Sequence, residues 1–350
     1  MNYDNSNYEM RFALDGGTAQ TTTSNAINPN GVKFMIGAIN DGTDTPFANY
    51  GQGQTNELII YKSDKNADRT QIESNIGDYF TQNTPLLDTY SGAAAAYSLR
   101  LLDSSYVGSA VEVYNGSSYA DIGFNVFGEL DTVALAAHCG SNDGFVSKWY
   151  DQAGSNDATQ TTTANMPKIY DGTTGVVTEN GKPACDFDGV DDRFELDVSA
   201  SGLNLDVANT SSFHVAQYDN ASTDRSMSLS LGGSSGAGRW YPMYMDNGNF
   251  EYGYGAVTQV STETGNTNQN LSTMIAGSTL GQAQAWRNGV SKMTATLATS
   301  GTMDDVVGIG VFRTSWYLDG TVQEVVIYNS DQSANRTNIE DNINTFYSIY

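Results

Sequence analysis

Glu324–Tyr347 reads EVVIYNSDQSANRTNIEDNINTFY, and Glu57–Phe80 reads ELIIYKSDKNADRTQIESNIGDYF. The two stretches are offset by a constant 267 residues and are identical at 12 of 24 positions. Each copy begins with a nearly continuous apolar run, which predicts a strand buried on both faces. Each copy then places apolar residues at helical spacing, which predicts a short helix with one apolar stripe. Two parts of the chain are therefore predicted to end with the same strand followed by the same helix.

This repeat divides the chain into two units. Residues 1–82 end with the first copy, and residues 83–350 end with the second. The first unit is less than a third as long as the second, so we interpret it as the back half of a domain whose front half is missing or supplied by another chain. A half domain exposes apolar surface and strand edges. We therefore expect self-association, or binding to other proteins, through residues 1–82.

The composition indicates an all-β protein with many tight turns. The 350 residues include 36 Gly, 21 Tyr and 13 Phe, with Asn, Thr and Ser between them. The hydrophobic fraction is 39% and the mean hydropathy is −0.39, as in soluble globular proteins. No apolar run approaches the roughly 18–20 residues of a membrane span, so membrane insertion is not expected.

The charge is strongly acidic, with 40 Asp and Glu against 16 Lys and Arg and a net charge of −24. A phosphate-binding surface needs clustered Lys and Arg, so nucleic acid is excluded as an expected partner. The carboxylates fit a solvated surface in a salty external medium. Asp188, Asp191 and Asp192, beside Asp186, could instead gather Ca²⁺, and the alternative is a capped turn with solvated charges. No other cofactor is expected.

Local patterns place further elements. Tyr8–Leu14 alternates and runs into Asp15-Gly16-Gly17, which predicts a hairpin. Strong helix formers predict a helix over residues 93–102, and a second helix is predicted at about residues 130–138, ending at Gly140. From Ala184 onward the pattern predicts strand after strand until the closing helix. Cys139 and Cys185 could form one disulfide or remain small buried side chains.

Four motifs in order resemble a laminin-G-like, concanavalin A-like sandwich. They are Cys185–Asp192 (CDFDGVDD), Trp286–Val290 (WRNGV), Val307–Gly310 (VGIG) and Tyr317–Tyr328 (YLDGTVQEVVIY). The resemblance implies an all-β, concanavalin A-like jelly-roll β-sandwich with a few short helices over residues 83–350, of which residues 184–350 are the laminin-G-like part. The repeated ending implies that residues 1–82 are a partial sandwich of the same type.

The preceding stretch, residues 83–183, resembles the front part of the arabinofuranosidase B catalytic domain of glycoside hydrolase family 54. The matching segments include Ala96–Arg100 (AYSLR), Asp121–Phe124 (DIGF) and Phe145–Gly154 (FVSKWYDQAG). Similar segments fused to such a sandwich resemble tail-fibre and other structural proteins of marine phages.

Hydrolysis of a glycosidic bond requires two carboxyl groups that flank that bond. The resemblance places a nucleophilic Glu in the stretch that corresponds to Ser228–Gly236, but this stretch contains no carboxylate. The resemblance also implies an aspartate that acts as the general acid, and Asp246 loosely matches its position. An acid without a nucleophile does not make a retaining glycosidase, so the chain is expected not to be an enzyme.

Sugar recognition requires aromatic faces and a few fixed polar groups. The sequence concentrates rings and carboxylates on two neighbouring predicted strands joined by Asn247-Gly248. The candidate carbohydrate-binding residues are Trp240, Tyr244, Asp246, Tyr252, Tyr254 and Trp316. The alternative for each ring is that it faces the core, because residues i and i+2 of a strand share one face.

These observations predict a non-enzymatic virion structural or adhesion protein, a phage tail fibre or capsid-surface component, with a lectin-like domain for a cell-surface glycan. The alternative is a secreted bacterial carbohydrate-binding module of a polysaccharide-degrading system. The expected location is the virion or the extracellular space.

Overall fold

The structure is a computed structural model in which the chain divides into two compact units, residues 1–81 and 82–350. It describes residues 2–4, 9–12, 20–23, 39–40, 46–47, 58–61, 63, 65, 67–73, 84–197, 203–221, 225–232, 240–254, 257–277, 281–296, 303 and 306–350.

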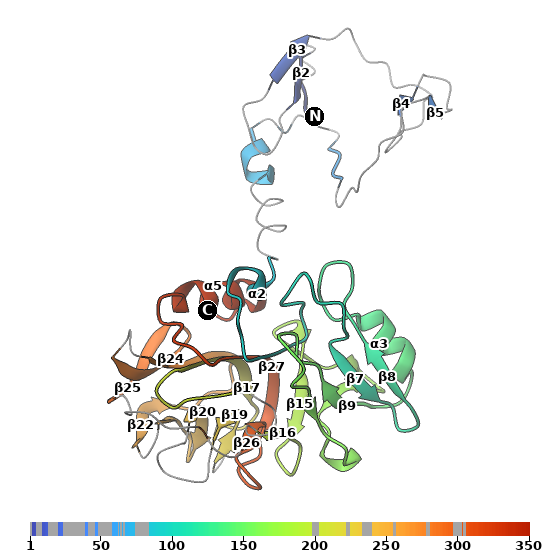
Figure 1. Ribbon diagram of the computed structural model, residues 1–350. Coiled ribbons are helices and arrows are strands. Elements are labelled where there is room, and N and C mark those ends of the chain that lie inside the picture. Colours follow the sequence, from blue (N-terminus) through green and yellow to red (C-terminus); the bar gives the residue numbers. More distant parts are fainter. Residues whose placement is uncertain are drawn as a thin grey trace. The chain divides into compact units, whose positions relative to one another are not determined.

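The first unit contains two small antiparallel sheets (Figure 1). One consists of β1 (Asn2–Asp4), β2 (Glu9–Phe12) and β3 (Gln20–Thr23), and the other of β4 (Ile39–Asn40) and β5 (Pro46–Phe47). Strands β2 and β3 form the hairpin that the alternating pattern predicts, and its turn lies outside the described residues. Residues 69–73 are helical, in agreement with the predicted closing helix of this unit.

The second unit is a sandwich of two antiparallel sheets, which confirms the predicted all-β fold (Figure 1). The strands of the first sheet lie in the order β25-β24-β23-β17-β27-β15-β11-β9-β7-β8. In chain order, the principal strands of this sheet are β6 (Ala95–Ser98), β7 (Val111–Tyr114), β8 (Tyr119–Ile122), β9 (Gly144–Trp149), β11 (Lys168–Asp171), β15 (Cys185–Asp188), β17 (Thr210–Tyr218), β23 (Asn270–Gly277), β24 (Gln282–Arg287), β25 (Val290–Thr296) and β27 (Asp319–Tyr328). Two short strands also belong to this sheet: β10 (Ala158–Thr159) pairs with β9, and β12 (Gly175–Val176) pairs with β11. A separate two-stranded sheet consists of β13 (Thr178–Glu179) and β14 (Lys182–Pro183).

The second sheet has the order β16-β26-β19-β20-β21-β22, with β18 paired to β20. Its strands are β16 (Phe194–Asp197), β18 (Ser226–Met227), β19 (Leu229–Leu231), β20 (Trp240–Asp246), β21 (Asn249–Tyr254), β22 (Val257–Thr264) and β26 (Val306–Ile309).

Strand β27 is the centre of the first sheet, as its apolar run predicts. One edge pairs with β17, and the other pairs with β15 and then with β6. Its side chains alternate between two cores: Val325 and Ile327 face the second sheet, whereas Val326 and Tyr328 pack under α5 (Arg336–Tyr347). The strand is therefore buried on both faces and paired on both edges.

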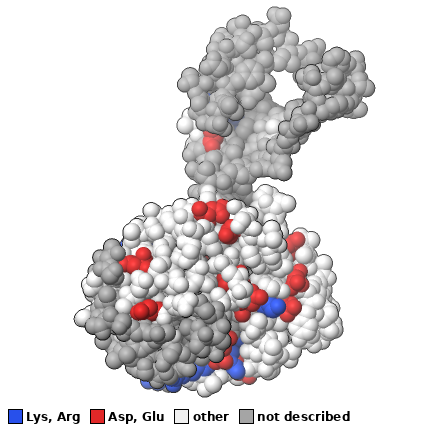
Figure 2. Space-filling view, viewed as in Figure 1, with Lys and Arg blue, Asp and Glu red and all other residues white. Residues whose placement is uncertain are grey.

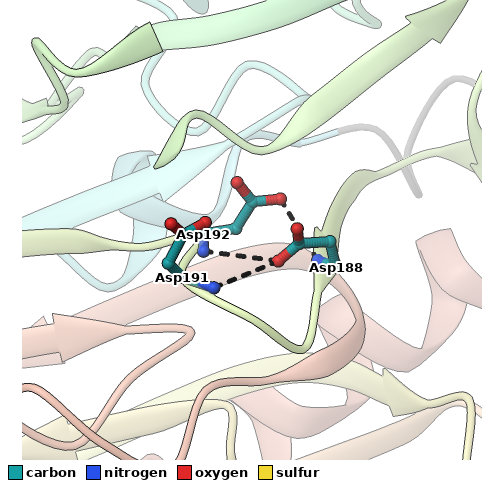
Figure 3. Close-up of side chains that lie close together, drawn as sticks. All are labelled: Asp188, Asp191 and Asp192. Atoms are coloured by element: carbon teal, nitrogen blue, oxygen red, sulfur yellow. Dashed lines mark hydrogen bonds between the residues drawn. The ribbon is translucent and has the colours of Figure 1, made fainter. Parts of the chain in front are cut away.

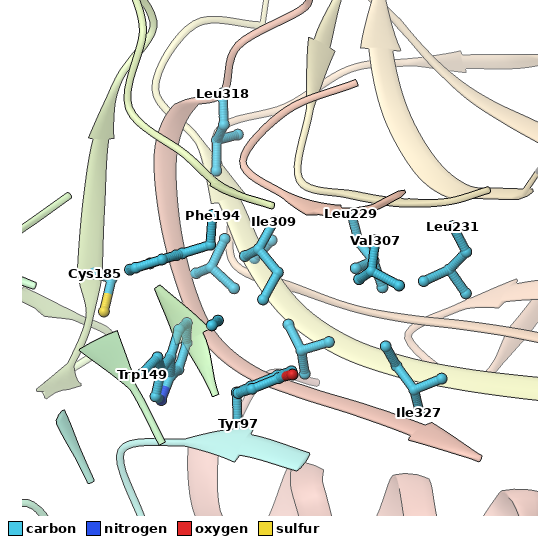
Figure 4. Close-up of a cluster of buried hydrophobic side chains, with 14 of the residues drawn as sticks. Tyr97, Trp149, Cys185, Phe194, Leu229, Leu231, Val307, Ile309, Leu318 and Ile327 are labelled. Atoms are coloured by element: carbon cyan, nitrogen blue, oxygen red, sulfur yellow. The ribbon is translucent and has the colours of Figure 1, made fainter. Parts of the chain in front are cut away.

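The principal core lies between the two sheets (Figure 4). Trp149 and Ile327 from the first sheet face Leu229 and Val307 from the second. Phe194 packs against Trp149, with the ring centroids 6.3 Å apart. A second core lies beneath α2 (Leu86–Thr89) and α5, on the other face of the first sheet.

One predicted helix is a strand. Residues 95–98 form β6, which pairs with β27 from Ser98 opposite Glu324 to Ala95 opposite Ile327. All four β6 side chains are fully buried. Helix propensity differs by less than 1 kcal/mol per residue among ordinary residues, so the ladder to β27 and this burial override it.

The predicted second helix is α3 (Thr132–Cys139), preceded by Asp131, whose side chain accepts hydrogen bonds from the N–H groups of Val133 and Ala134. A short 3₁₀ turn, η1, spans Thr163–Asn165. Cys139 and Cys185 are both buried and unbonded, so they pack as small side chains. Among the described residues, no helix has the length and apolar character that crossing a membrane requires.

Candidate functional site

The candidate site lies on the outer face of the second sheet, away from the principal core. Trp240, Met243 and Met245 of β20 face the core. Tyr241 and Tyr244 face the opposite side, although they are three positions apart in the strand. A β-bulge between them, which contains Pro242, explains this spacing, because the extra residue shifts the alternation of the strand.

The two tyrosines belong to an aromatic cluster that includes Phe312 and Trp316. The Trp316 ring stacks on Tyr244 with an interplanar angle of 15° and a centroid distance of 5.7 Å. Phe312 lies 4.9 Å from Trp316 and 5.0 Å from Tyr241, centroid to centroid. Trp316 is partly exposed, whereas Tyr241, Tyr244 and Phe312 are buried. The cluster therefore presents Trp316 as its accessible ring.

Two carboxylates share this face. Glu251 of β21 accepts a hydrogen bond from the Tyr244 hydroxyl, and the two residues lie opposite each other in the ladder. Asp246 lies two residues beyond Tyr244 on the same strand, which makes it the diagonal neighbour of Glu251. Burial and the Glu251 carboxylate raise the pKa of the Tyr244 phenol above its usual range, so the phenol remains a hydrogen-bond donor.

Arg225 connects the carboxylates to the rings. Its Nε lies 3.4 Å from Asp246 Oδ2, and its Cζ lies 4.7 Å from the Trp316 ring centroid. The side chain of Arg225 is 49% exposed. The site therefore presents a cation and an indole to solvent, with the buried carboxylate of Asp246 directly behind the cation.

The backbone at this site is strained. Arg225, Arg313 and Trp316 have φ of 59°, 56° and 58°, a region that large side chains seldom adopt. Such strain costs of order 1–3 kcal/mol for each residue and concentrates at functional sites. Three strained residues around one cluster support its interpretation as a site.

The structure separates the six predicted carbohydrate-binding residues into two groups. Tyr244, Asp246 and Trp316 lie together on the outer face, as described above. Trp240, Tyr252 and Tyr254 are at most 3% exposed and pack in the principal core. Alternation along β21 places Tyr252 and Tyr254 on the core side, and the bulge in β20 puts Trp240 on the opposite side from Tyr244.

Sequence reasoning left Arg225, Tyr241 and Phe312 out of the candidate set. Arg225 follows residues that carry no motif, and Phe312 lies in a loop far along the chain. Pro242 was the available signal for Tyr241, since proline inside a strand marks a bulge.

The three aspartates considered for a metal do lie together (Figure 3). Carboxylate oxygens of Asp188, Asp191 and Asp192 lie within 4.8 Å of one another. Asp188 Oδ1 accepts from the N–H of Val190 at 2.9 Å and of Asp191 at 3.3 Å, as in a capped turn. Burial and Asp188 raise the pKa of Asp192 to about 7. Carboxylate oxygens suit Ca²⁺, but the turn accounts for the same geometry, so Ca²⁺ binding stays a prediction.

Acidic side chains are dispersed over the surface seen in Figure 2, where Lys and Arg gather near the lower edge. The described part of this face presents no continuous basic surface of the kind that nucleic-acid backbones require.

No protein-family model matches the sequence, and no curated protein sequence matches it significantly. Solved structures do match the fold. A GH54 α-L-arabinofuranosidase soaked with a cyclic sulfate inhibitor superposes with a TM-score of 0.57 at 15% identity. An arabinofuranosidase in complex with arabinofuranosyl-α-1,2-xylobiose superposes with a TM-score of 0.54, also at 15% identity. The chain has the arabinofuranosidase sandwich fold. Each match covers 74% of this chain, which spans 64% of the length of either enzyme.

These matches correct two expectations. The interpretation as a non-enzymatic virion structural protein is wrong, because the solved structures that share the fold are glycoside hydrolases. The expectation that the chain is not an enzyme is wrong on the same finding. It depended on a missing carboxylate at residues 228–236, whereas the structure brings Asp246 and Glu251 together on another pair of strands. The alternative expectation, a carbohydrate-binding domain, agrees better with these matches. The laminin-G-like resemblance of residues 184–350 stays a prediction.

Proposed function

We propose that residues 84–350 form a carbohydrate-active domain that binds a neutral sugar at the site built by Arg225, Tyr244, Asp246, Glu251 and Trp316. The observation that carries this proposal is the partly exposed Trp316 ring, stacked on Tyr244 beside Asp246 and Arg225. The shared fold with arabinofuranosidases supports the substrate class.

The chemistry of the site fits a sugar. An indole provides an apolar face for the C–H groups of a sugar ring, and this contact needs little change in the protein. Carboxylate oxygens accept hydrogen bonds from sugar hydroxyls, and a guanidinium donates them in a fixed geometry. Because Arg225 already pairs with Asp246, its charge is partly neutralised, which disfavours an acidic sugar at this position. We therefore expect neutral arabinose- or xylose-containing oligosaccharides as ligands.

The test is calorimetric titration of the full chain with arabinoxylan and xylan oligosaccharides. Trp316→Ala should weaken binding at least tenfold, which corresponds to about 1.4 kcal/mol. Tyr119→Ala is the matched control, since Tyr119 is a 50% exposed ring on β8 of the first sheet. Binding that survives Trp316→Ala, or that is lost equally in Tyr119→Ala, would contradict the proposed site.

Hydrolysis of a glycosidic bond is a second candidate function, favoured by the diagonal placement of Asp246 and Glu251. Diagonal neighbours across two strands have Cβ atoms roughly 7–8 Å apart or slightly closer. Glycosidases use carboxyl groups about 5–5.5 Å apart for retention and about 6.5–9.5 Å apart for inversion. The backbone positions of the pair are therefore compatible with the carboxyl separations that this chemistry requires.

Release of nitrophenol from 4-nitrophenyl α-L-arabinofuranoside tests this second candidate. Activity that falls at least a hundredfold in both Asp246→Asn and Glu251→Gln would assign the pair. No release by the unmodified chain, with oligosaccharide binding retained, would leave a binding domain and reject hydrolysis of this substrate.

A further inference from the structure

The two copies of the closing strand have different surroundings. In the second unit, Val325 to Tyr328 are fully buried within β27. The corresponding residues of the first unit, Leu58, Ile59, Ile60 and Tyr61, are 51%, 45%, 63% and 47% exposed. Four consecutive large apolar residues that are exposed to this degree mark a surface that another element covers.

The second unit shows what that element is. Strand β6 pairs along the edge of β27, with Ser98 opposite Glu324 and Tyr97 opposite Val325. On the other edge, β17 pairs with β27 from Gly320 to Tyr328, with one bulge in the ladder. The described residues 58–61 have no assigned strand partner.

The sequence of the first unit retains the positions that serve these contacts. Tyr50, Gly53 and Glu57 stand 267 residues before Tyr317, Gly320 and Glu324, respectively. In β27, Gly320 has φ of 146°, and a Cβ there would lie 2.2 Å from the carbonyl oxygen of Gln217 in β17. Only glycine admits that close approach, so Gly53 predicts a neighbouring strand equivalent to β17.

Glu324 specifies the other neighbour. It is fully buried, and Arg100 donates to its Oε2 from Nε at 2.7 Å and to its Oε1 from Nη2 at 2.9 Å. Ser98 Oγ donates to the same Oε2 at 2.8 Å. A buried carboxylate requires such partners. Glu57 therefore predicts a neighbouring strand with a Ser-x-Arg ending, like Ser98-Leu99-Arg100.

The helix that follows supports the equivalence of the two copies. Arg336 pairs with Glu340 in α5, and Arg69 pairs with Glu73 at the same spacing in the first unit.

A second copy of this chain does not supply the missing strands. Each chain carries two closing segments, at Glu57–Phe80 and Glu324–Tyr347, but one front half, residues 84–323. That front half is already closed by β27 and α5. A copy could supply the strands equivalent to β6 and β17 only if it opened its own sandwich.

We propose that Leu58–Tyr61 is a docking strand for a polypeptide from outside residues 1–350 that carries a front half like residues 84–323. Its β6-like strand pairs antiparallel with the docking strand and places its arginine on Glu57. This inference is independent of sugar binding.

The experiment uses the full chain and a fluorescent peptide, GAAAAYSLRLL, which is the sequence of residues 92–102. We expect the peptide to bind by anisotropy, whereas a scrambled peptide does not. Glu57→Gln in the chain, or arginine to glutamine in the peptide, should weaken binding at least tenfold. The two changes together should weaken it little further, because both remove one interaction.

Ile60→Asp should abolish peptide binding, because Ile60 corresponds to the core residue Ile327. Val133→Asp is the matched control, since Val133 of α3 is 78% exposed in the other unit and should leave binding unchanged. Light scattering of the chain alone separates the remaining outcomes. A dimer that Ile60→Asp disrupts, without peptide binding, would assign the strand to a second copy and overturn the proposal. A monomer that does not bind the peptide would overturn it as well.

Discussion

Two of the clusters in residues 84–350 that combine an arginine, a carboxylate and an aromatic ring, those of Arg100 and Arg225, differ in burial. Arg100 is 4% exposed, pairs with both oxygens of Glu324, and lies 5.0 Å from the Phe346 ring. Arg225 is 49% exposed, makes one 3.4 Å contact with Asp246, and lies 4.7 Å from the Trp316 ring. The first cluster joins β6, β27 and α5, whereas the second leaves its arginine accessible. The same chemistry therefore stabilises the fold in one place and is available to a ligand in the other.

Substitution of the carboxylates should separate the two clusters most strongly. Glu324→Gln leaves the Arg100 charge buried without its partner, so the free energy of unfolding should fall by about 3–5 kcal/mol. Asp246→Asn should change it by less than about 1 kcal/mol, because its partner Arg225 is half exposed and solvent screens the charge that is left unpaired. Urea denaturation followed by circular dichroism measures both values. If both variants lost the same free energy of unfolding, the two clusters would not differ in their contribution to stability.

The buried histidine His214 should make the stability of the fold depend on pH in acid. His214 is fully buried with its Nε2 2.9 Å from Ser228 Oγ, and burial lowers its pKa to about 3. Between pH 6.5 and 3 the unfolded chain binds a proton that the folded chain does not, so stability falls as pH falls. The slope should approach about 1.4 kcal/mol for each pH unit in this window. In His214→Gln this part of the slope should vanish, and an unchanged slope would show that other groups cause it.

Replacing each arginine by methionine shows whether it contributes to sugar binding or to the stability of the fold. Arg225→Met should weaken oligosaccharide binding by about tenfold and change the free energy of unfolding by less than about 1 kcal/mol. Arg100→Met should instead cost several kcal/mol of stability, because Glu324 is left buried and unpaired. Calorimetric titration and urea denaturation of both variants provide the comparison. Normal sugar affinity in Arg225→Met would exclude Arg225 from the site.

The smallest expected effect concerns Asp192. Its pKa is raised to about 7 in the folded protein, so the folded state binds more protons than the unfolded state between about pH 4 and 7. Stability is therefore lost as pH rises through 7. Asp192→Asn should raise Tm at pH 8 by roughly 2–4 °C, which corresponds to about 1 kcal/mol, and should have no effect near pH 3.

Calcium provides the control for this variant. If Asp188, Asp191 and Asp192 bind Ca²⁺, the ion should raise Tm in the unmodified chain and much less in Asp192→Asn. Equal responses to Ca²⁺ in both proteins would leave the three aspartates as a capped turn.

The site was predictable only in part. The aromatic and acidic content of residues 240–254 indicated a sugar site, and Tyr244, Asp246 and Trp316 do lie together. Trp240, Tyr252 and Tyr254 fill the core instead. Which rings face outward depends on the bulge at Pro242, and Arg225 reaches Trp316 across 91 residues of sequence. Local patterns carry no information about such contacts.

The sequence by itself determined the repeat, the all-β class, the buried closing strand and the amphipathic closing helix, because these follow from local periodicity and from comparison of the chain with itself. Only the tertiary structure decided that Ala95–Ser98 is a strand, that Glu324 lies on Arg100, and that Asp246 and Glu251 share one face. Each of these depends on pairing between distant segments. The free energy of burial and of a completed hydrogen-bond ladder exceeds the small local preferences that the sequence displays.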